Sequence, residues 1–154
     1  MTAMRWAQIA PLAFTVLAGA CHAPQAPASS PVDISFRLVW TGPADLDLYV
    51  KEPGGTEISR HSTHSPTGGV YSGDCNATPE TMCANPVETV FWPKRRAPGG
   101  AFQYRVRLVN VHGEPLPITF TITILHGTRI VSEEQGSIAQ IGKDWGPRDT
   151  RWPK

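Results

Sequence analysis

The sequence has no excess of charge of either sign. Its 154 residues include 14 Lys and Arg against 13 Asp and Glu, and charged residues make up 18% of the chain. Proteins that bind nucleic acid usually gather basic residues on one face. The basic clusters here, at 93–96 and 148–154, are short and typical of solvated loops and tails. We therefore expect no nucleic-acid partner.

The sequence also lacks the motifs of common enzyme classes. It has no G-x-S-x-G nucleophile elbow and no ordered Ser/His/Asp set. It has no glycine-rich loop that would cradle a phosphate. His61 and His64 have a spacing that suits zinc, but the sequence fixes no third ligand near them. We therefore expect a protein that is not an enzyme.

Only one long apolar run is present, and it indicates export. It spans 6–20, follows Arg5, and ends in small residues directly before Cys21. This is the pattern of a signal peptide, and the run is short for a membrane span. The ending "LAGAC" is similar to a bacterial lipobox, which predicts a signal peptide over 1–20 and lipid attachment at Cys21. Ordinary secretion is the alternative. His22, rather than Asp, follows Cys21, which favours the outer membrane, facing the periplasm or the cell surface.

Cysteine is scarce, with three residues in the chain. If Cys21 carries lipid, Cys75 and Cys83 remain, and two nearby cysteines in an oxidising compartment favour a disulfide. A zinc site is the alternative, but the chain has no second pair with ligand spacing. A disulfide here would make the loop between the two cysteines rigid.

No stretch shows a convincing helical period, and 15 prolines and 14 glycines favour short elements. Residues 21–31 are rich in Pro, Ala and Ser and predict an extended tether. From residue 32 onward apolar and polar residues alternate with period two. The clearest runs are 33–40, 45–52, 88–92, 102–112, 117–125 and 129–138. We predict one all-β domain over 32–141, an antiparallel β-sandwich or jelly roll, followed by a loose tail over 142–154.

Two aspartates stand on one face of a predicted strand. Asp45 and Asp47 alternate with Leu46 and Leu48, so their side chains start about 6.6–6.8 Å apart. Carboxylates at this spacing can converge on calcium, which takes several oxygen ligands. Further oxygens would come from elsewhere, and the candidates are Asp74 and Asn76 in a turn-rich stretch and Glu88 at the start of a predicted strand. Three purely structural alternatives stay open: Asp45 caps a turn, Asp47 is a solvated residue that pairs with Arg105 or Arg107, or Asp74 serves only to form a turn.

The same segments resemble a known family. The runs at 38–55, 68–76, 88–93 and 102–111 resemble the YfaP-type family of exported bacterial domains, over roughly residues 34–130. The matching positions are Trp40, Asp45, Asp47, Leu48, Val50, Pro53, Gly55, Gly68, Gly69, Asp74, Glu88 and Trp92. There is a fainter similarity to the TerD-type calcium-binding sandwich. The resemblance implies a fold and an acidic site at Asp45, Asp47, Asp74 and Glu88, but it implies no activity.

These observations predict a bacterial envelope lipoprotein with a non-enzymatic β-sandwich module. We expect the module to be stabilised by calcium and to bind an unidentified protein or glycan, or to be purely structural. The alternative is a metal-assisted hydrolase or an accessory domain of one. That alternative requires an open coordination position and a base, such as His61 or His64, beside the aspartates.

Overall fold

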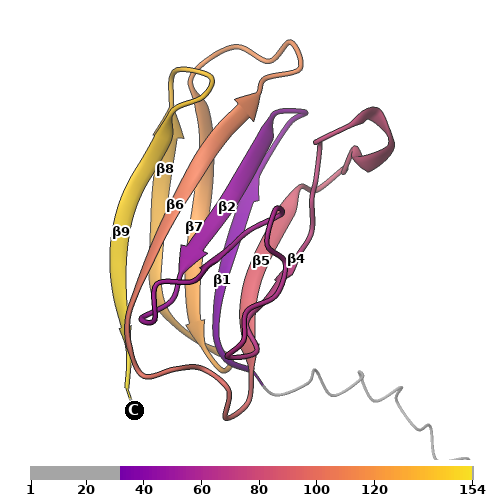
Figure 1. Cartoon of the computed structure of the whole chain (residues 1–154). Helices are drawn as coiled ribbons and strands as arrows, with labels where there is room; N and C mark the ends of the chain where they lie inside the picture. The colour runs from indigo at the N-terminus through magenta and orange to yellow at the C-terminus, as the bar shows by residue number, and fades with distance from the viewer. Residues whose placement is uncertain (1–31, 154) are drawn as a thin grey trace, which may run out of the picture.

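The computed structural model describes residues 32–153. The predicted signal peptide, the lipid attachment at Cys21 and the tether over 21–31 lie outside the described residues. Within these residues the chain is all-β, with two antiparallel sheets packed face to face (Figure 1). The predicted β-sandwich is therefore confirmed. No helix in this part of the chain has the length and apolar character needed to cross a membrane.

The two sheets contain nine strands. In spatial order the first sheet has β4 (Val70–Ser72), β5 (Val87–Pro93), β1 (Val32–Trp40), β7 (Ile118–His126) and β8 (Arg129–Ile138). The second sheet has β3 (Glu57–Ile58), β2 (Asp45–Lys51), β6 (Gly100–Asn110) and β9 (Asp144–Trp152). A short 3-10 turn, Pro79–Thr81, lies between β4 and β5.

The core forms where the apolar faces of the two sheets meet. Phe36 of β1, Trp92 of β5 and Phe102 of β6 are fully buried and come from both sheets. The rings of Trp92 and Phe102 meet edge to face with centroids 4.9 Å apart, and the Phe36 and Phe102 centroids lie 5.9 Å apart. Burying each such side chain contributes about 1.5–3 kcal/mol. The apolar residues that alternate along the strands therefore form one core between the two sheets.

The prediction of a loose C-terminal tail is wrong. Residues 144–152 form β9, which pairs with β6 at the edge of the second sheet. Trp145 on β9 packs edge-on against Phe120, with centroids 5.4 Å apart. The segment is mostly polar and contains Pro147, so its sequence lacks the apolar–polar alternation that predicts a strand. An edge strand tolerates proline, and Pro147 lies at a register shift in the β6–β9 pairing.

One edge of β2 is only partly covered, and this gap positions the site. β3 has two residues and pairs with Val50 and Lys51, so it does not reach the first part of β2. The segment between β3 and β4 passes beside β2 instead (Figure 1).

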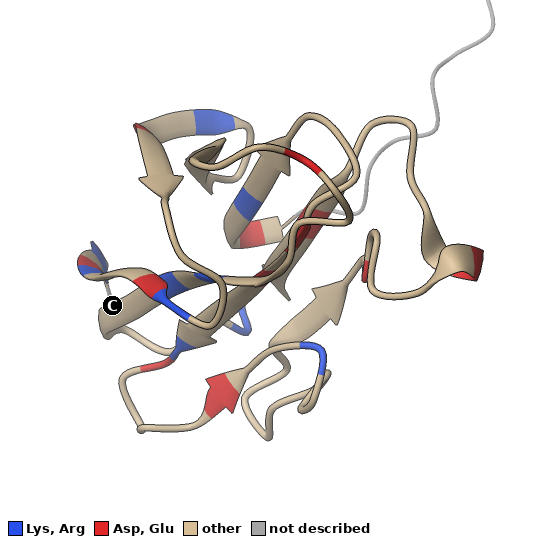
Figure 2. Cartoon of the chain, turned by 90° about the horizontal axis from the view of Figure 1, so that it is seen from above, with Lys and Arg blue, Asp and Glu red and all other residues tan. Residues whose placement is uncertain are grey.

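Acidic and basic residues are intermixed over the elements when the molecule is seen from above (Figure 2).

Candidate metal centre

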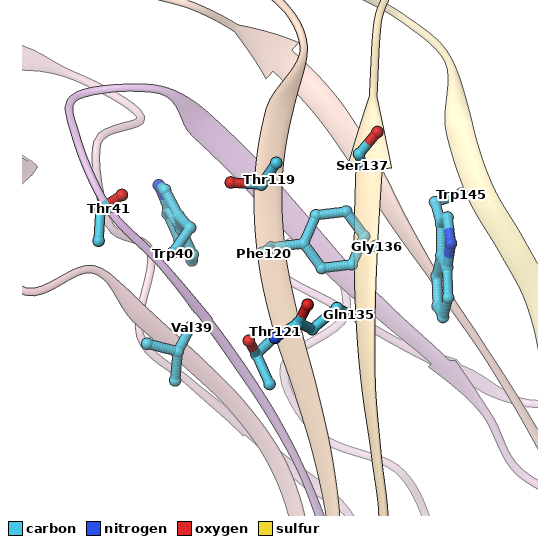
Figure 3. Close-up of a pocket in the computed structure, with 10 residues that line it drawn as sticks. All are labelled: Val39, Trp40, Thr41, Thr119, Phe120, Thr121, Gln135, Gly136, Ser137 and Trp145. Atoms are coloured by element: carbon cyan, nitrogen blue, oxygen red, sulfur yellow. The ribbon is translucent and has the colours of Figure 1, made fainter.

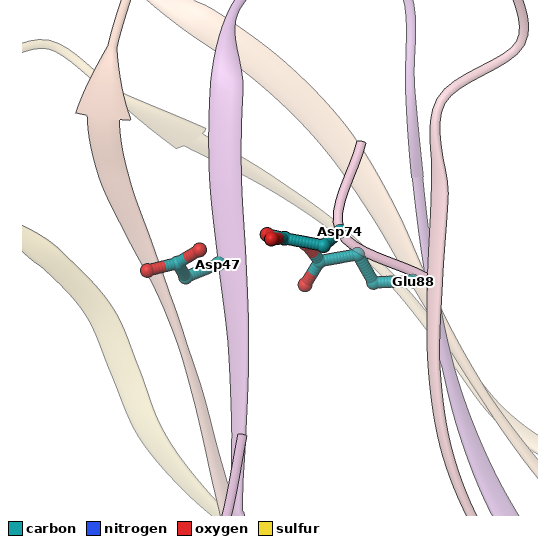
Figure 4. Close-up of side chains that lie close together, drawn as sticks. All are labelled: Asp47, Asp74 and Glu88. Carbon is teal, nitrogen blue, oxygen red and sulfur yellow. The ribbon is translucent and has the colours of Figure 1, made fainter. Parts of the chain in front are cut away.

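Three acidic side chains converge beside the uncovered edge of β2. Asp47 lies on β2, Asp74 follows β4, and Glu88 lies on β5. Each offers a carboxylate oxygen, and these oxygens all lie within 4.8 Å of one another. Asp74 and Glu88 extend toward the strand that carries Asp47 (Figure 4). The group therefore joins β2 of one sheet to β5 of the other.

Glu88 is the most deeply buried member, with an exposed fraction of 0%. Its Oε2 accepts a hydrogen bond of 2.7 Å from the backbone N–H of Leu48, on the part of β2 that β3 does not cover. Its Oε1 is buried and has no hydrogen bond of good geometry to any of residues 32–153. The Tyr71 hydroxyl lies beside Glu88; burial and then the Glu88 carboxylate raise the pKa of Tyr71, but the contact between the two side chains lacks hydrogen-bond geometry. Burial raises the pKa of Glu88 well above its usual value, because an ion in this place loses its hydration.

Asp47 is almost as buried, with an exposed fraction of 1%. Its Oδ2 accepts a hydrogen bond of 3.1 Å from the Tyr49 hydroxyl and lies 3.0 Å from Nε of Arg60. Its Oδ1 is buried without a partner. Burial raises the pKa of Asp47, while the charge of Arg60 acts in the opposite direction. Asp47 therefore has one oxygen engaged within the protein and one that is unpartnered.

The structural alternative, in which Asp47 is a solvated strand residue that pairs with Arg105 or Arg107, is wrong. Arg107 is its neighbour across the β2–β6 pair, but the Arg107 guanidinium bonds to Asp144 instead. Arg105 bonds to Asp144 and Glu57. The partner of Asp47 is Arg60, from the segment after β3. The sequence could not show this partner, because the path of that segment across β2 follows from the tertiary fold.

Asp45 lies beside the group but is not one of its three members. It is buried, with an exposed fraction of 2%, and its Oδ1 has no hydrogen-bond partner. Burial, followed by the charge of Asp47, raises its pKa from 3.8 to about 6. The structure therefore brings together Asp47, Asp74 and Glu88 of the four predicted residues, and leaves Asp45 as a neighbour.

Asp74 is the exposed member of the group. It follows Gly73, which has a φ of 97°, and a Cβ on Gly73 would lie 2.5 Å from the carbonyl oxygen of Val87. The loop can therefore pass this close to β5 only with glycine there. The predicted disulfide between Cys75 and Cys83 is confirmed, with the two Cα atoms 5.5 Å apart. Asp74 thus lies between Gly73, which packs closely against β5, and the loop that the disulfide closes.

The donor set determines which chemistry the centre can support. All three members are carboxylates, and among residues 32–153 no histidine or cysteine joins the group. Oxygen donors suit hard cations such as Ca²⁺ and Mg²⁺, whereas zinc prefers nitrogen and sulfur. A buried ionised carboxylate without a partner costs several kcal/mol, so it either takes up a proton or meets a cation. The unpartnered oxygens of Asp47 and Glu88 fit a cation.

A shallow groove of about 750 Å³ lies elsewhere, across β1, β7, β8 and β9. Every residue that lines it is uncharged, including Val39, Thr121, Ser137 and Trp145 (Figure 3). The groove contains none of the acidic residues, so it is separate from the candidate metal centre.

The geometry of the acidic centre bears on the family resemblance only in part. The YfaP-type resemblance implied an acidic site at Asp45, Asp47, Asp74 and Glu88, and the fold brings the last three together, but their role and the family itself stay predictions. Comparisons of the chain with protein-family models, with curated proteins and with solved structures found no match.

Proposed function

We propose that the chain is a non-enzymatic β-sandwich module that binds calcium at Asp47, Asp74 and Glu88. The observation that carries the proposal is the buried Oε1 of Glu88, which lacks a hydrogen bond of good geometry among the described residues although Tyr71 lies close, on a side chain that belongs to a group of three converging carboxylates. An isolated buried carboxylate oxygen is costly to maintain, and a cation would satisfy it. The second unpartnered oxygen, Oδ1 of Asp47, supports the same interpretation.

Calcium fits the donor set better than other common cations. It accepts six to eight oxygen ligands in flexible geometry, and water supplies ligands that the protein does not. Asp74 is exposed, so solvent reaches the centre from that side. Magnesium requires nearly ideal octahedral geometry and gives up its water reluctantly. A centre with two buried carboxylates and one exposed carboxylate therefore favours calcium.

A bound ion would act mainly on stability. Asp47 and Glu88 belong to different sheets, and they meet where β3 leaves the edge of β2 uncovered. A cation shared by the two residues would tie the sheets together at this gap. Because the unfolded chain does not hold the three carboxylates together, binding free energy would add to folding free energy. We propose calcium as a stabilising ion and assign it no catalytic role.

The setting we propose is the bacterial envelope, with the module attached through lipid at Cys21 and an unidentified protein or glycan as partner. The alternative, a metal-assisted hydrolase, requires a base at the metal. Among the described residues the acidic group includes neither His61 nor His64. The observations therefore favour the non-enzymatic module.

Calorimetric titration tests the proposed site. The purified protein is stripped of metal with a chelator, dialysed, and titrated separately with Ca²⁺, Mg²⁺ and Zn²⁺. We expect one calcium site, weaker magnesium binding, and loss of the calcium signal in Asp74→Asn, which alters an exposed residue and leaves the fold intact. Asp149→Asn is the matched control, because Asp149 is an exposed acid outside the group. Equal calcium binding in the two variants, or none in the wild type, refutes the site.

A further inference from the structure

We propose that Asn76 is a positioning residue of this centre, which fixes Asp74 against the start of β2. The inference rests on the proposed calcium site and extends it to a residue whose side-chain amide is engaged in hydrogen bonds within the protein. Asn76 is fully buried, with an exposed fraction of 0%, and has a φ of 68°. Its hydrogen bonds connect the loop that carries Asp74 with the turn that leads into Asp45 and Asp47.

The side-chain amide of Asn76 binds the turn between β1 and β2. Its Nδ2 donates a hydrogen bond of 3.0 Å to the carbonyl oxygen of Ala44 and one of 3.2 Å to that of Gly42. Ala44 directly precedes Asp45, the first residue of β2. One amide group therefore holds the beginning of the strand that carries Asp47.

The rest of Asn76 is bound within the disulfide loop. Its Oδ1 accepts a hydrogen bond of 2.9 Å from the backbone N–H of Cys83, and its own N–H donates to the carbonyl oxygen of Thr81 at 2.9 Å. The Nε2 atom of His112, in the turn after β6, lies 2.9 Å from the carbonyl oxygen of Asn76. The disulfide closes this loop at Cys75. Asn76 thus joins three segments that are distant in the sequence.

This arrangement matters for Asp74 because of how each carboxylate is held. Asp47 and Glu88 lie on strands of the two sheets, and hydrogen bonds and an ion pair orient them. Asp74 lies in a loop, two residues before Asn76. Without the Asn76 bonds the loop would sample more positions, and calcium binding would have to overcome the entropy of ordering it. We therefore assign calcium affinity in part to the Asn76 amide.

Replacement of Asn76 by glycine separates the side-chain bonds from the backbone conformation. Glycine adopts a φ near 68° without strain, so Asn76→Gly removes the three side-chain bonds and keeps the turn. Residues that orient metal ligands typically change affinity by about 10–100-fold when they are altered. We expect calcium binding about 10-fold weaker or more in Asn76→Gly, measured by titration calorimetry.

The control separates positioning from general loss of stability. Asp33→Ala removes two hydrogen bonds, 2.9 and 3.1 Å long, that Oδ2 of Asp33 accepts from the backbone N–H groups of Arg96 and Ala97, and so loosens a loop outside the acidic group. Unfolding by urea is measured for both variants beside their calcium affinity. Asn76→Gly should lose affinity well beyond any loss in Asp33→Ala, even where the two variants are destabilised alike.

A second variant keeps the test decisive if Asn76→Gly fails to fold. Asn76→Asp keeps the acceptor for Cys83 but loses the donors to Gly42 and Ala44 and sets a carboxylate oxygen against their carbonyl oxygens, so we expect a loss of affinity here as well. Wild-type affinity in whichever variant folds, with a wild type that binds calcium, overturns the role of Asn76. A wild type that does not bind calcium overturns the proposed function itself.

Discussion

At the scale of the residue, Glu88 shows how a single hydrogen bond places an acid inside a core. Its Oε2 accepts a hydrogen bond of 2.7 Å from the Leu48 N–H, while Oε1 has no hydrogen bond of good geometry to the described residues. The first contact makes Glu88 part of the fold, because it satisfies a backbone amide that no strand pairs with. The unpartnered Oε1 makes Glu88 a candidate metal ligand. The two oxygens of one side chain therefore have separate roles.

Replacement of Glu88 by glutamine should separate these roles. The carbonyl oxygen of the amide can still accept the Leu48 N–H, so Glu88→Gln is expected to fold with metal-free stability at least equal to that of the wild type. Calcium binding should be lost, because a fully buried carboxylate is replaced by a neutral group. Urea unfolding in chelator and calcium titration measure the two effects. Glu57→Gln, an exposed acid on β3 outside the group, is the control. Retained calcium binding in Glu88→Gln would exclude Glu88 as a ligand.

Asp45 predicts an unusual dependence of stability on pH. Burial raises its pKa from 3.8 to about 6. Between these values the folded chain holds a proton that the unfolded chain has released, so stability in chelator should fall as the pH rises from about 4 through 6. Asp45→Asn cannot ionise, and its stability relative to the wild type should increase over this interval. Urea unfolding at pH 4 and at pH 7.5 measures the change. A stability difference between the two proteins that does not vary with pH contradicts the assignment.

The sequence predicted the acids of the site better than their partners. Asp45 and Asp47 were recognisable from their alternation with leucines, and Asp74 and Glu88 as oxygen donors in a turn-rich stretch and at the start of a strand, but Asp45 is not a member of the group. Arg60 was missed, and Asn76 was recognised only as a candidate oxygen donor and not for its hydrogen bonds. Arg60 reaches Asp47 because a loop crosses β2, and the function of Asn76 depends on carbonyl groups of a turn more than thirty residues earlier in the chain. Neither contact leaves a periodic or local signal.

At the scale of the element, strand alternation predicted the buried strands well and the edge strand poorly. β6 and β7 each bury every second side chain, as their sequences indicate. β9 is mostly polar, because an edge strand of a sandwich buries few side chains, and this made it resemble a tail. β2 departs from alternation for a different reason. A loop covers its outer face, so Asp45 and Asp47 are buried along with the leucines.

Removal of β9 tests its place in the fold. A chain that ends at residue 143 would lose one of the two strands that pair with β6, and the contact between Trp145 and Phe120. We expect a large loss of stability, with more than about 1.5 kcal/mol from the apolar contact alone. Urea unfolding and binding of a hydrophobic dye measure the effect. A truncated chain with an unchanged unfolding midpoint would restore the interpretation of this segment as a loose tail.

At the scale of the whole molecule, the fold is two sheets around one aromatic core, with an acidic centre at the edge where they meet. The apolar contacts hold the middle of the sandwich, through Phe36, Trp92 and Phe102. Near the uncovered part of β2, carboxylates from both sheets replace such contacts. Without a cation these charges weaken the fold, and with one they should strengthen it.

Thermal unfolding with calcium and with chelator tests this claim most directly. A ligand that binds only the folded state adds about 2.7 kcal/mol at 100 times its dissociation constant, which should raise the midpoint on the order of 10 °C. We expect this rise in the wild type, increasing with calcium concentration, and no rise in Glu88→Gln. A wild-type midpoint that is the same in calcium and in chelator, or an equal rise in both proteins, would contradict a calcium centre between the sheets.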